Sequence, residues 1–343
     1  FNDPPTTPIT TYACAGRVRG VYETAPPGTG PAPSRVPARS PSCPAVACQT
    51  APMTSRDETT DPAPTAAGTP PELPPPGAVP GALDVPGTWN ARDVGGRAVP
   101  AGHDEPLRTG VLLRTASLSR LTPAGQAAIV DLDVRTVVDL RGGDELARDG
   151  ADAVPGGVRV LRRGMDPTPG LVDGGAGAGA SADPAALVAG LLAADDPAAV
   201  ARRLMHGVYA TFVTDPGIRE TVGRVLADVA AADGASVVHC SAGKDRTGWV
   251  VALVQYVAGV PEEERMVEYL ASAAAAEGLA ALVPPLPGLS PEALAPVLTV
   301  EPAYLEGAWE LAVREHGSID DYLVACGVTT AVRDALVARL VAS

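Results

Sequence analysis

Short apolar runs alternate with longer segments of helical spacing from about residue 89 to the end of the chain. Two runs rich in β-branched residues, 111–113 and 134–140, predict strands that are buried on both faces. Two more strands are expected at 158–161 and 236–239. Helical spacing is found at 123–132, 217–232, 247–258, 261–277, 301–316, 318–326 and 328–341. This alternation predicts an α/β fold with a central, largely parallel sheet, flanking helices and a C-terminal helical cap.

Three further segments connect or extend these elements. Residues 184–213 have helical spacing with a break near Pro197, and the Gly, Ala and Asp residues of 170–184 predict a flexible connection before them. The proline-rich segment 284–296 predicts a turn between two helices. No internal repeat is visible.

The first quarter of the chain has a different composition. Twenty of the 36 prolines fall within residues 1–86, together with many Gly, Ala, Thr and Ser residues. Such a segment cannot bury enough apolar surface to offset its chain entropy, so we expect 1–86 to be a disordered tail and 87–343 to be one domain. The first methionine is Met53, and one hypothesis is that the natural start lies there and that 1–52 is upstream sequence.

Composition narrows the classes of partner and compartment. A net charge of −14 argues against nucleic acid as the main partner, and the absence of a long apolar run predicts no membrane span. Five cysteines without a C-x-x-C pair and four scattered histidines predict no metal site, and we expect no cofactor. We expect the reducing cytoplasm, with export by a route that needs no signal peptide as the open alternative.

The segment from Val237 to Gly248, V-V-H-C-S-A-G-K-D-R-T-G, carries the candidate chemistry. It runs from a predicted buried strand through a short loop into a helix N-terminus. That arrangement directs backbone N–H groups and the positive end of the helix dipole at one point. We therefore expect an anion of phosphate size to bind at 241–246, which contains Ser241, Ala242, Gly243, Lys244, Asp245 and Arg246.

A cysteine at the start of this loop and an arginine six positions later would face the same anion. Arg246 offers a planar fork of donors, and the positive field favours the thiolate of Cys240, as similar surroundings lower thiol pKa values from about 8.5 to roughly 3.5–7.5. A thiolate that faces phosphorus is suited to covalent phosphoryl transfer. Thr247 would donate its hydroxyl to the sulfur, and His239 would orient the loop through backbone contacts.

The spacing of cysteine and arginine is a weak signal by itself, and its neighbours strengthen it. Only Cys240 among the five cysteines has an arginine six residues later. A buried structural cysteine would leave the surrounding Gly, Lys, Asp and Arg residues unexplained. A nucleotide-binding loop is excluded because Gly243-Lys244 is followed by Asp245 rather than Ser or Thr.

These residues resemble the cysteine-based protein tyrosine phosphatases, in particular the bacterial atypical branch of dual and triple specificity with the motif H-C-x-x-G-K-D-R-T-G. The resemblance runs from about Trp89 to the C-terminus. It rests on N-A-R-D-V-G-G at 90–96, L-R-T-A and L-S-R-L at 113–121, V-D-L-R at 138–141 with Glu145, and segments at 304–305, 317–318 and 321–323.

The resemblance implies a cysteine-phosphatase fold and hydrolysis of phosphotyrosine without a metal. It also implies activity on phosphoserine or phosphothreonine, and sometimes on phosphoinositides, with Lys244-Asp245 marking the branch of broader specificity. The chain departs from the family pattern at Ala91, where an aromatic residue is usual, and at Asp144, where Ser or Arg is common. Both departures concern substrate contacts near the pocket rim.

Cleavage of a phosphoester requires a proton for the leaving oxygen, and two aspartates compete for this role. Asp166 follows the 158–161 strand and matches the family's aspartate at that place, although a turn residue before a proline is the plain alternative. Asp245 lies inside the loop and could act as the acid or brace the loop. Both remain open.

Other polar residues receive supporting roles. Lys244 would add positive charge beside the phosphate, with a solvated lysine as the alternative. Asp139 and Arg141 end a predicted buried strand, where a structural ion pair is as plausible as a substrate contact. The 184–213 segment resembles a lid that covers the pocket in this family, and its glycine-rich approach would allow it to hinge. A fixed helix pair is the equal alternative.

Three rival functions deserve a test. The nearest keeps the chemistry and changes the substrate to a phosphoinositide or inositol phosphate. A non-catalytic phosphate-binding module is disfavoured because binding alone does not need the thiol of Cys240. Sulfur transfer of the rhodanese type is disfavoured by Arg246 and Thr247.

Overall fold

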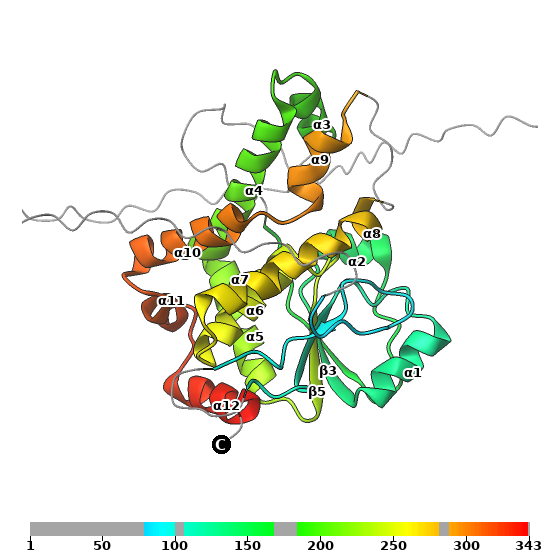
Figure 1. Cartoon of the computed structure of the whole chain (residues 1–343), viewed down its shortest axis with the longest axis vertical. Coiled ribbons are helices and arrows are strands. Elements are labelled where there is room, and N and C mark those ends of the chain that lie inside the picture. The colour runs from blue at the N-terminus through cyan, green and yellow to red at the C-terminus, as the bar shows by residue number, and fades with distance from the viewer. Residues whose placement is uncertain (1–78, 100–105, 168–183, 281–287, 342–343) are drawn as a thin grey trace, which may run out of the picture. The chain divides into compact units, whose positions relative to one another are not determined.

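The computed structural model describes residues 79–99, 106–167, 184–280 and 288–341, and a five-stranded sheet lies at its centre (Figure 1). The strands are β1 (Arg92–Asp93), β2 (Leu112–Thr115), β3 (Val134–Asp139), β4 (Arg159–Arg162) and β5 (Ala235–His239). Their order is β1-β2-β5-β3-β4. The strands β2, β5, β3 and β4 run parallel, and β1 pairs antiparallel with β2. The predicted α/β class and largely parallel sheet are confirmed.

The two middle strands, β5 and β3, are buried by helices on both faces. Val138 and Val238 face the larger of two cores, whereas Val137 and Val237 face a smaller core beneath α1 (Pro123–Asp131). Successive side chains of a strand point to opposite faces, so the adjacent valines of each strand contribute to both cores.

The register aligns the carboxyl ends of three strands. His239 of β5 pairs with Thr115 of β2 on one side and with Asp139 of β3 on the other. The segments that follow these strands therefore meet at one edge of the sheet, where ligands bind in folds of this kind.

The larger core lies between the sheet and the helices on the side opposite α1. Trp249 of α6 (Asp245–Val257) is fully buried there and packs on Phe212 and Tyr322.

The remaining helices are α2 (Gly143–Asp149), α3 (Pro184–Leu192), α4 (Pro197–Thr214), α5 (Pro216–Ala230), α7 (Glu262–Leu270), α8 (Ala276–Ala280), α9 (Pro291–Leu298), α10 (Pro302–His316), α11 (Ile319–Ala325) and α12 (Thr330–Leu340). None of the described helices has the length and apolar character needed to cross a membrane.

Several helix boundaries follow from capping residues. Thr122 accepts a hydrogen bond from the Gly125 N–H at the start of α1. The predicted break near Pro197 is present, because α3 ends at Leu192 and Asp196 caps α4. Helices α3, α4 and α9 lie together at the top of Figure 1, beyond the edge of the sheet.

The prediction of a turn over 284–296 is wrong in its second half, because α9 begins there. Ser290 caps this helix and Pro291 occupies its first position, where proline is favoured. The predicted helix 261–277 is also interrupted, since α7 ends at Leu270 and a 3₁₀ turn, Ala271–Ala275, follows. The short elements β1 and α2 were not predicted, because two and seven residues give no clear periodicity.

The packed chain begins earlier than the predicted boundary at residue 87. Val85 is buried, the Leu83 N–H donates to Ala91, and Ala82 bridges to Arg92 of β1. The prediction of a disordered tail is therefore wrong for 79–86. Residues 1–78, including the hypothesis of a start at Met53, and the predicted connection 170–183 lie outside the described residues.

Two glycines in helices provide a matched test of this packing. A methyl group on Gly223 of α5 would lie 1.9 Å from the Cys326 carbonyl oxygen, whereas one on Gly207 of α4 would meet nothing within 4 Å. We expect Gly223→Ala to lower the free energy of unfolding by about 1–3 kcal/mol. We expect Gly207→Ala to raise it by up to about 1 kcal/mol, because alanine favours the helix. Urea unfolding followed by circular dichroism measures both, and equal stabilities would contradict the close approach at Gly223.

Candidate active site

The candidate loop, residues 240–244, connects the end of β5 to the start of α6. Cys240 is only 2% exposed. Gly243 has φ of 66°, and a side chain there would lie 2.2 Å from the Thr115 carbonyl oxygen. Both facts require glycine at this position. The loop therefore lies tightly against the end of β2.

Side-chain donors hold the loop by its carbonyl oxygens. The Asn90 amide donates to Ala242 (3.2 Å) and Gly243 (2.8 Å), and Arg114 donates to Gly243 (2.5 Å). Among the described residues, the backbone N–H groups of 241–245 make no hydrogen bond. Donors thus occupy the acceptors of the loop and leave its N–H groups for an anion at the N-terminus of α6.

A buried ionic cluster supports these donors. Glu268 accepts from Arg92 Nε at 2.7 Å and from Arg114 Nη1 at 2.8 Å, and all three side chains are at most 1% exposed. Burial and the neighbouring Arg114 lower the pKa of Arg92 to about 9. Burial alone would raise the pKa of Glu268, but the two guanidinium groups lower it below its ordinary value. Removal of the carboxylate would leave two buried cations without their partner.

Arg246 is held in place by Glu145 of α2. Its Nη1 and Nη2 atoms lie 2.5 and 2.6 Å from the two carboxylate oxygens, and Ser241 also donates to Glu145 (2.5 Å). Burial alone would raise the pKa of Glu145, but Arg246 lowers it to about 2. Burial opposes a rise in the pKa of Arg246, yet the charges of Cys240 and Glu145 raise it above its ordinary value. The guanidinium remains charged and fixed in orientation.

The first candidate acid, Asp166, is exposed and lies beside this ion pair. Its carboxylate lies so close to Gly142 that a side chain at Gly142 would overlap it, at 1.5 Å. The preceding residue, Met165, accepts from Arg246 Nη1 at 3.2 Å. Asp166 therefore follows a residue that contacts Arg246, and its side chain is exposed.

The second candidate, Asp245, is held by two neighbours. It accepts from the Tyr209 hydroxyl of α4 at 3.0 Å, and Lys244 Nζ lies 3.2 Å from its other oxygen. Burial raises the pKa of Tyr209 well above its ordinary value, so its hydroxyl stays protonated as a donor. Asp245 thus connects the loop to α4.

Lys244 is buried, so the alternative of a solvated lysine is wrong. Its side chain is 3% exposed, and Nζ donates to the carbonyl oxygens of Val297 (2.5 Å) and Thr299 (2.9 Å) at the C-terminal end of α9. A cation is favoured at that end of a helix. The positive charge that was predicted beside the phosphate is instead bonded to carbonyl oxygens at the end of α9 in this structure.

Thr247 is fully buried in the first turn of α6. Its hydroxyl makes no hydrogen bond to any described group, including the Cys240 sulfur. The predicted bond from this hydroxyl to the sulfur is therefore not formed in this structure.

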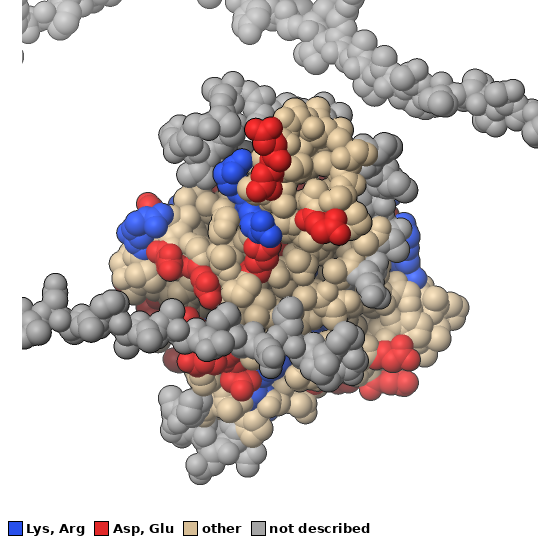
Figure 2. Space-filling view, turned by 45° about the horizontal axis from the view of Figure 1, so that its top comes forward, with Lys and Arg blue, Asp and Glu red and all other residues tan. Residues whose placement is uncertain are grey.

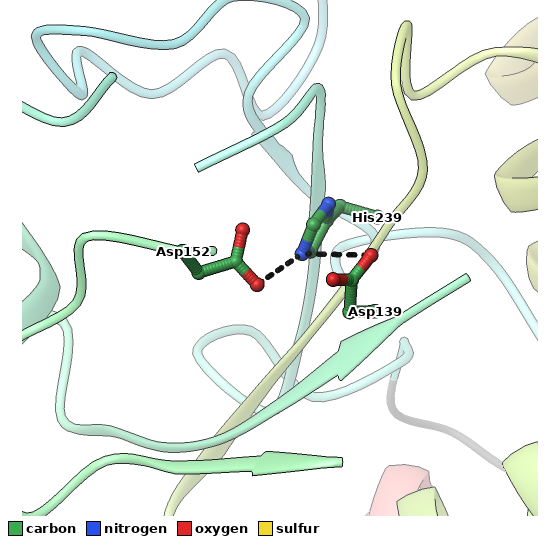
Figure 3. Close-up of side chains that lie close together, drawn as sticks. All are labelled: Asp139, Asp152 and His239. Carbon is green, nitrogen blue, oxygen red and sulfur yellow. Dashed lines mark hydrogen bonds and ion pairs between the residues drawn. The ribbon is translucent and has the colours of Figure 1, made fainter. Parts of the chain in front are cut away.

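Behind the loop, the side chains of Asp139, Asp152 and His239 form a second buried cluster (Figure 3), which Arg141 joins. His239 Nδ1 lies 3.1 Å from the Cys240 carbonyl oxygen, and Nε2 lies 3.0 Å from Asp152 Oδ2. Arg141 donates to both oxygens of Asp139 and to Asp152 Oδ1. Asp139 and Arg141 thus form a structural ion pair and, both being 1% exposed, lie away from solvent.

Asp139, Asp152 and His239 lie close enough to hold a metal ion, but their ligand atoms already have partners. Both oxygens of each aspartate accept hydrogen bonds from Arg141 or His239. A cation would have to displace the Arg141 guanidinium, so these residues do not fit a metal site.

The structure brings the predicted loop residues together with partners that the sequence did not identify. Glu145 and Asn90 appeared only as part of the family resemblance. Asp152 and Glu268 contact the loop or its supports from distant positions, and no local pattern marks them.

Comparisons with known proteins identify the family of this chain. Residues 83–342 match the model of the tyrosine phosphatase family. The chain is 33% identical to the triple specificity protein phosphatase PtpB of Mycobacterium tuberculosis over an alignment of 273 residues. The alignment covers 72% of this chain and 95% of that protein. It is 29% identical to a tyrosine-protein phosphatase of Nostoc commune, over 52% of this chain and 54% of that protein. A solved structure, that of TpbA from P. aeruginosa, is 19% identical to this chain. The match covers 64% of this chain and 94% of the TpbA chain, with a TM-score of 0.26.

The pH dependence of stability tests the ion pair between Glu145 and Arg246. The folded pKa of Glu145, about 2, lies below the ordinary 4.5, so its stabilising contribution is complete above pH 4.5 and is lost as the pH falls toward 2. We expect Glu145→Gln to be less stable than the wild type at pH 6, with a difference that narrows between pH 4.5 and 3. Urea unfolding across this range measures the difference, and a constant gap would contradict the pair.

Proposed function

The chain belongs to the tyrosine phosphatase family, and we propose that it hydrolyses phosphotyrosine through a phosphocysteine formed on Cys240. One observation carries the proposal. The buried Cys240 begins a loop whose carbonyl oxygens are bound from outside and whose N–H groups are available, while Glu145 fixes Arg246 at the same helix N-terminus. This arrangement would bind a phosphate dianion beside a nucleophile.

In the first step, the Cys240 thiolate attacks phosphorus and the sulfur–phosphorus bond forms as the bond to the tyrosine oxygen breaks. A carboxylic acid protonates the departing oxygen. In the second step, water attacks phosphorus, the sulfur–phosphorus bond breaks, and the thiolate and inorganic phosphate are released. The carboxylate formed in the first step accepts the proton of the water.

Arg246 and the loop N–H groups would stabilise the phosphoryl oxygens as the bonds change. Because Glu145 already orients the guanidinium, little reorganisation is needed when substrate binds. Lys244 would contribute through its field and through α9 rather than by direct contact.

We assign the general acid role to Asp166 and keep Asp245 as the alternative. Asp166 is exposed beside Arg246, where a leaving group can reach it. Asp245 already accepts from Tyr209 and Lys244, which suits a bracing role between the loop and α4. The role of 184–213 as a lid stays a prediction.

The substrate range is the part of the proposal that the named relative informs. The similar protein from Mycobacterium tuberculosis is a triple specificity phosphatase, so we include phosphoserine and phosphothreonine as secondary substrates and phosphoinositides as the alternative. Relative rates on a phosphotyrosine peptide, a phosphoserine peptide and phosphoinositide vesicles would rank them. We place the enzyme in the reducing cytoplasm, which keeps a nucleophilic thiol free.

Replacement of the nucleophile is the direct test of the proposed chemistry. We expect the wild type to hydrolyse a phosphotyrosine peptide in EDTA, and Cys240→Ser to lose all measurable turnover, because an alcohol is not ionised near neutral pH. Cys326→Ala is the matched control, since Cys326 is also buried but lies outside the site. Phosphate release measures all three proteins, and activity in Cys240→Ser would refute the thiolate mechanism.

The leaving group separates the two candidate acids. We expect Asp166→Asn to lower kcat/KM on phenyl phosphate by about 10²–10⁴-fold, because kcat/KM reports the first step and the leaving oxygen of phenyl phosphate needs a proton there. The same variant should lose less than about tenfold on p-nitrophenyl phosphate, whose leaving group departs unprotonated. If Asp245→Asn showed this selective loss and Asp166→Asn did not, the assignment would be reversed.

A further inference from the structure

Asp152 is a residue that the chemistry described above does not use, yet it lies directly behind the nucleophile. It precedes Ala153, whose N–H donates to Leu118 and whose carbonyl oxygen accepts from Gln126 of α1. This anchoring brings its carboxylate against His239, the residue before Cys240. Figure 3 shows the His239 ring between the two aspartates.

The contacts of the His239 ring determine its protonation. Nδ1 lies 3.1 Å from the Cys240 carbonyl oxygen, which can only accept a hydrogen bond. Nε2 lies 3.0 Å from an Asp152 oxygen and 3.8 Å from Asp139, and both ionised carboxylates can also only accept. Each ring nitrogen therefore needs a proton, and a ring with two N–H groups is an imidazolium.

We propose that Asp152 is a positioning residue that holds His239, the residue before the nucleophile, as a buried imidazolium. The inference rests on the proposed function for its meaning in catalysis. Its structural part, the protonation of His239, stands independently of any substrate.

The charges of the cluster balance only if His239 is protonated. Two carboxylates, Asp139 and Asp152, face two cations, Arg141 and the His239 imidazolium, and all are at most 1% exposed as side chains. Burial alone would raise the pKa of Asp152, but the bond from His239 lowers it, in agreement with an ionised carboxylate. A neutral His239 would leave one buried negative charge without compensation.

The consequence for Cys240 is an additional positive charge that does not compete for the phosphate. The imidazolium lies behind the loop and contacts its backbone, whereas Arg246 reaches the site from α6. A cation next to a thiol favours the thiolate, and a bonded carbonyl oxygen fixes the peptide that carries it.

Asp152→Asn is an isosteric variant that removes the charge and preserves the packing. The amide oxygen can still accept from Arg141, and its NH₂ group can donate to Nε2, which then carries no proton. The variant should therefore convert His239 to the neutral form with a proton on Nδ1 alone. Asp139 and Arg141 would remain a balanced pair.

Nitrogen NMR of protein labelled with ¹⁵N-histidine measures the protonation directly. The chain has four histidines, and His239→Gln identifies the signals of interest. We expect both ring nitrogens of His239 to carry protons in the wild type at pH 7.5, and only Nδ1 to carry one in Asp152→Asn. A neutral His239 ring in the wild type would overturn the proposal.

Alkylation of Cys240 by iodoacetate measures the effect on the thiolate, independently of turnover. We expect the pH of half-maximal alkylation rate to rise by roughly one unit in Asp152→Asn, with a parallel shift of the acid limb of kcat/KM. Asp149→Asn is the control, because Asp149 pairs with Arg148 at the surface of the same region. An unchanged alkylation profile in a folded Asp152→Asn with a neutral His239 would also overturn the proposal.

These readouts separate the inference from the proposed function. A protein that shows the imidazolium and the shifted alkylation profile, but hydrolyses no phosphoester, would support the inference and refute the phosphatase assignment. An active phosphatase with a neutral His239 would support the phosphatase assignment and refute the inference.

Discussion

The proposed binding of a doubly charged anion beside a thiolate is the constraint on which this account of the structure depends. Two negative groups can approach only if donors surround them, so the loop of 240–244 must present its N–H groups and not its carbonyl oxygens. The donors that make this possible come from Asn90 and Arg114 on one side and His239 on the other. Each binds a carbonyl oxygen. Arg114 lies in β2 and His239 ends β5, whereas Asn90 lies just before β1.

Buried cations that lie close together repel one another and lose contact with water. Buried carboxylates offset this cost in free energy. Glu145 neutralises Arg246, Glu268 lies between Arg92 and Arg114, and the pair Asp139 and Asp152 faces Arg141 and His239. Each carboxylate also fixes the direction of the cation that it binds. Orientation and charge are thus supplied by the same contacts, which is the form of preorganisation that favours reaction at phosphorus.

The sequence predicted the elements with strong periodicity and the residues within one continuous motif. The four parallel strands and the loop from Cys240 to Arg246 belong to this class. Two residues that reach the loop from far along the chain could not be predicted, because Asp152 and Glu268 follow no local pattern. Helix α9 was missed because its prolines suggested a turn, although Ser290 and Pro291 form a common helix start.

Covalent trapping of the intermediate tests the central claim most directly. Enzyme that is turning over a phosphotyrosine peptide would be quenched in neutral denaturant and digested with trypsin, and the peptide 225–244 contains Cys240 and no other cysteine. The account predicts one added phosphoryl group on that peptide, located at Cys240 and absent when substrate is omitted. Turnover that places the phosphoryl group on any other residue would contradict it.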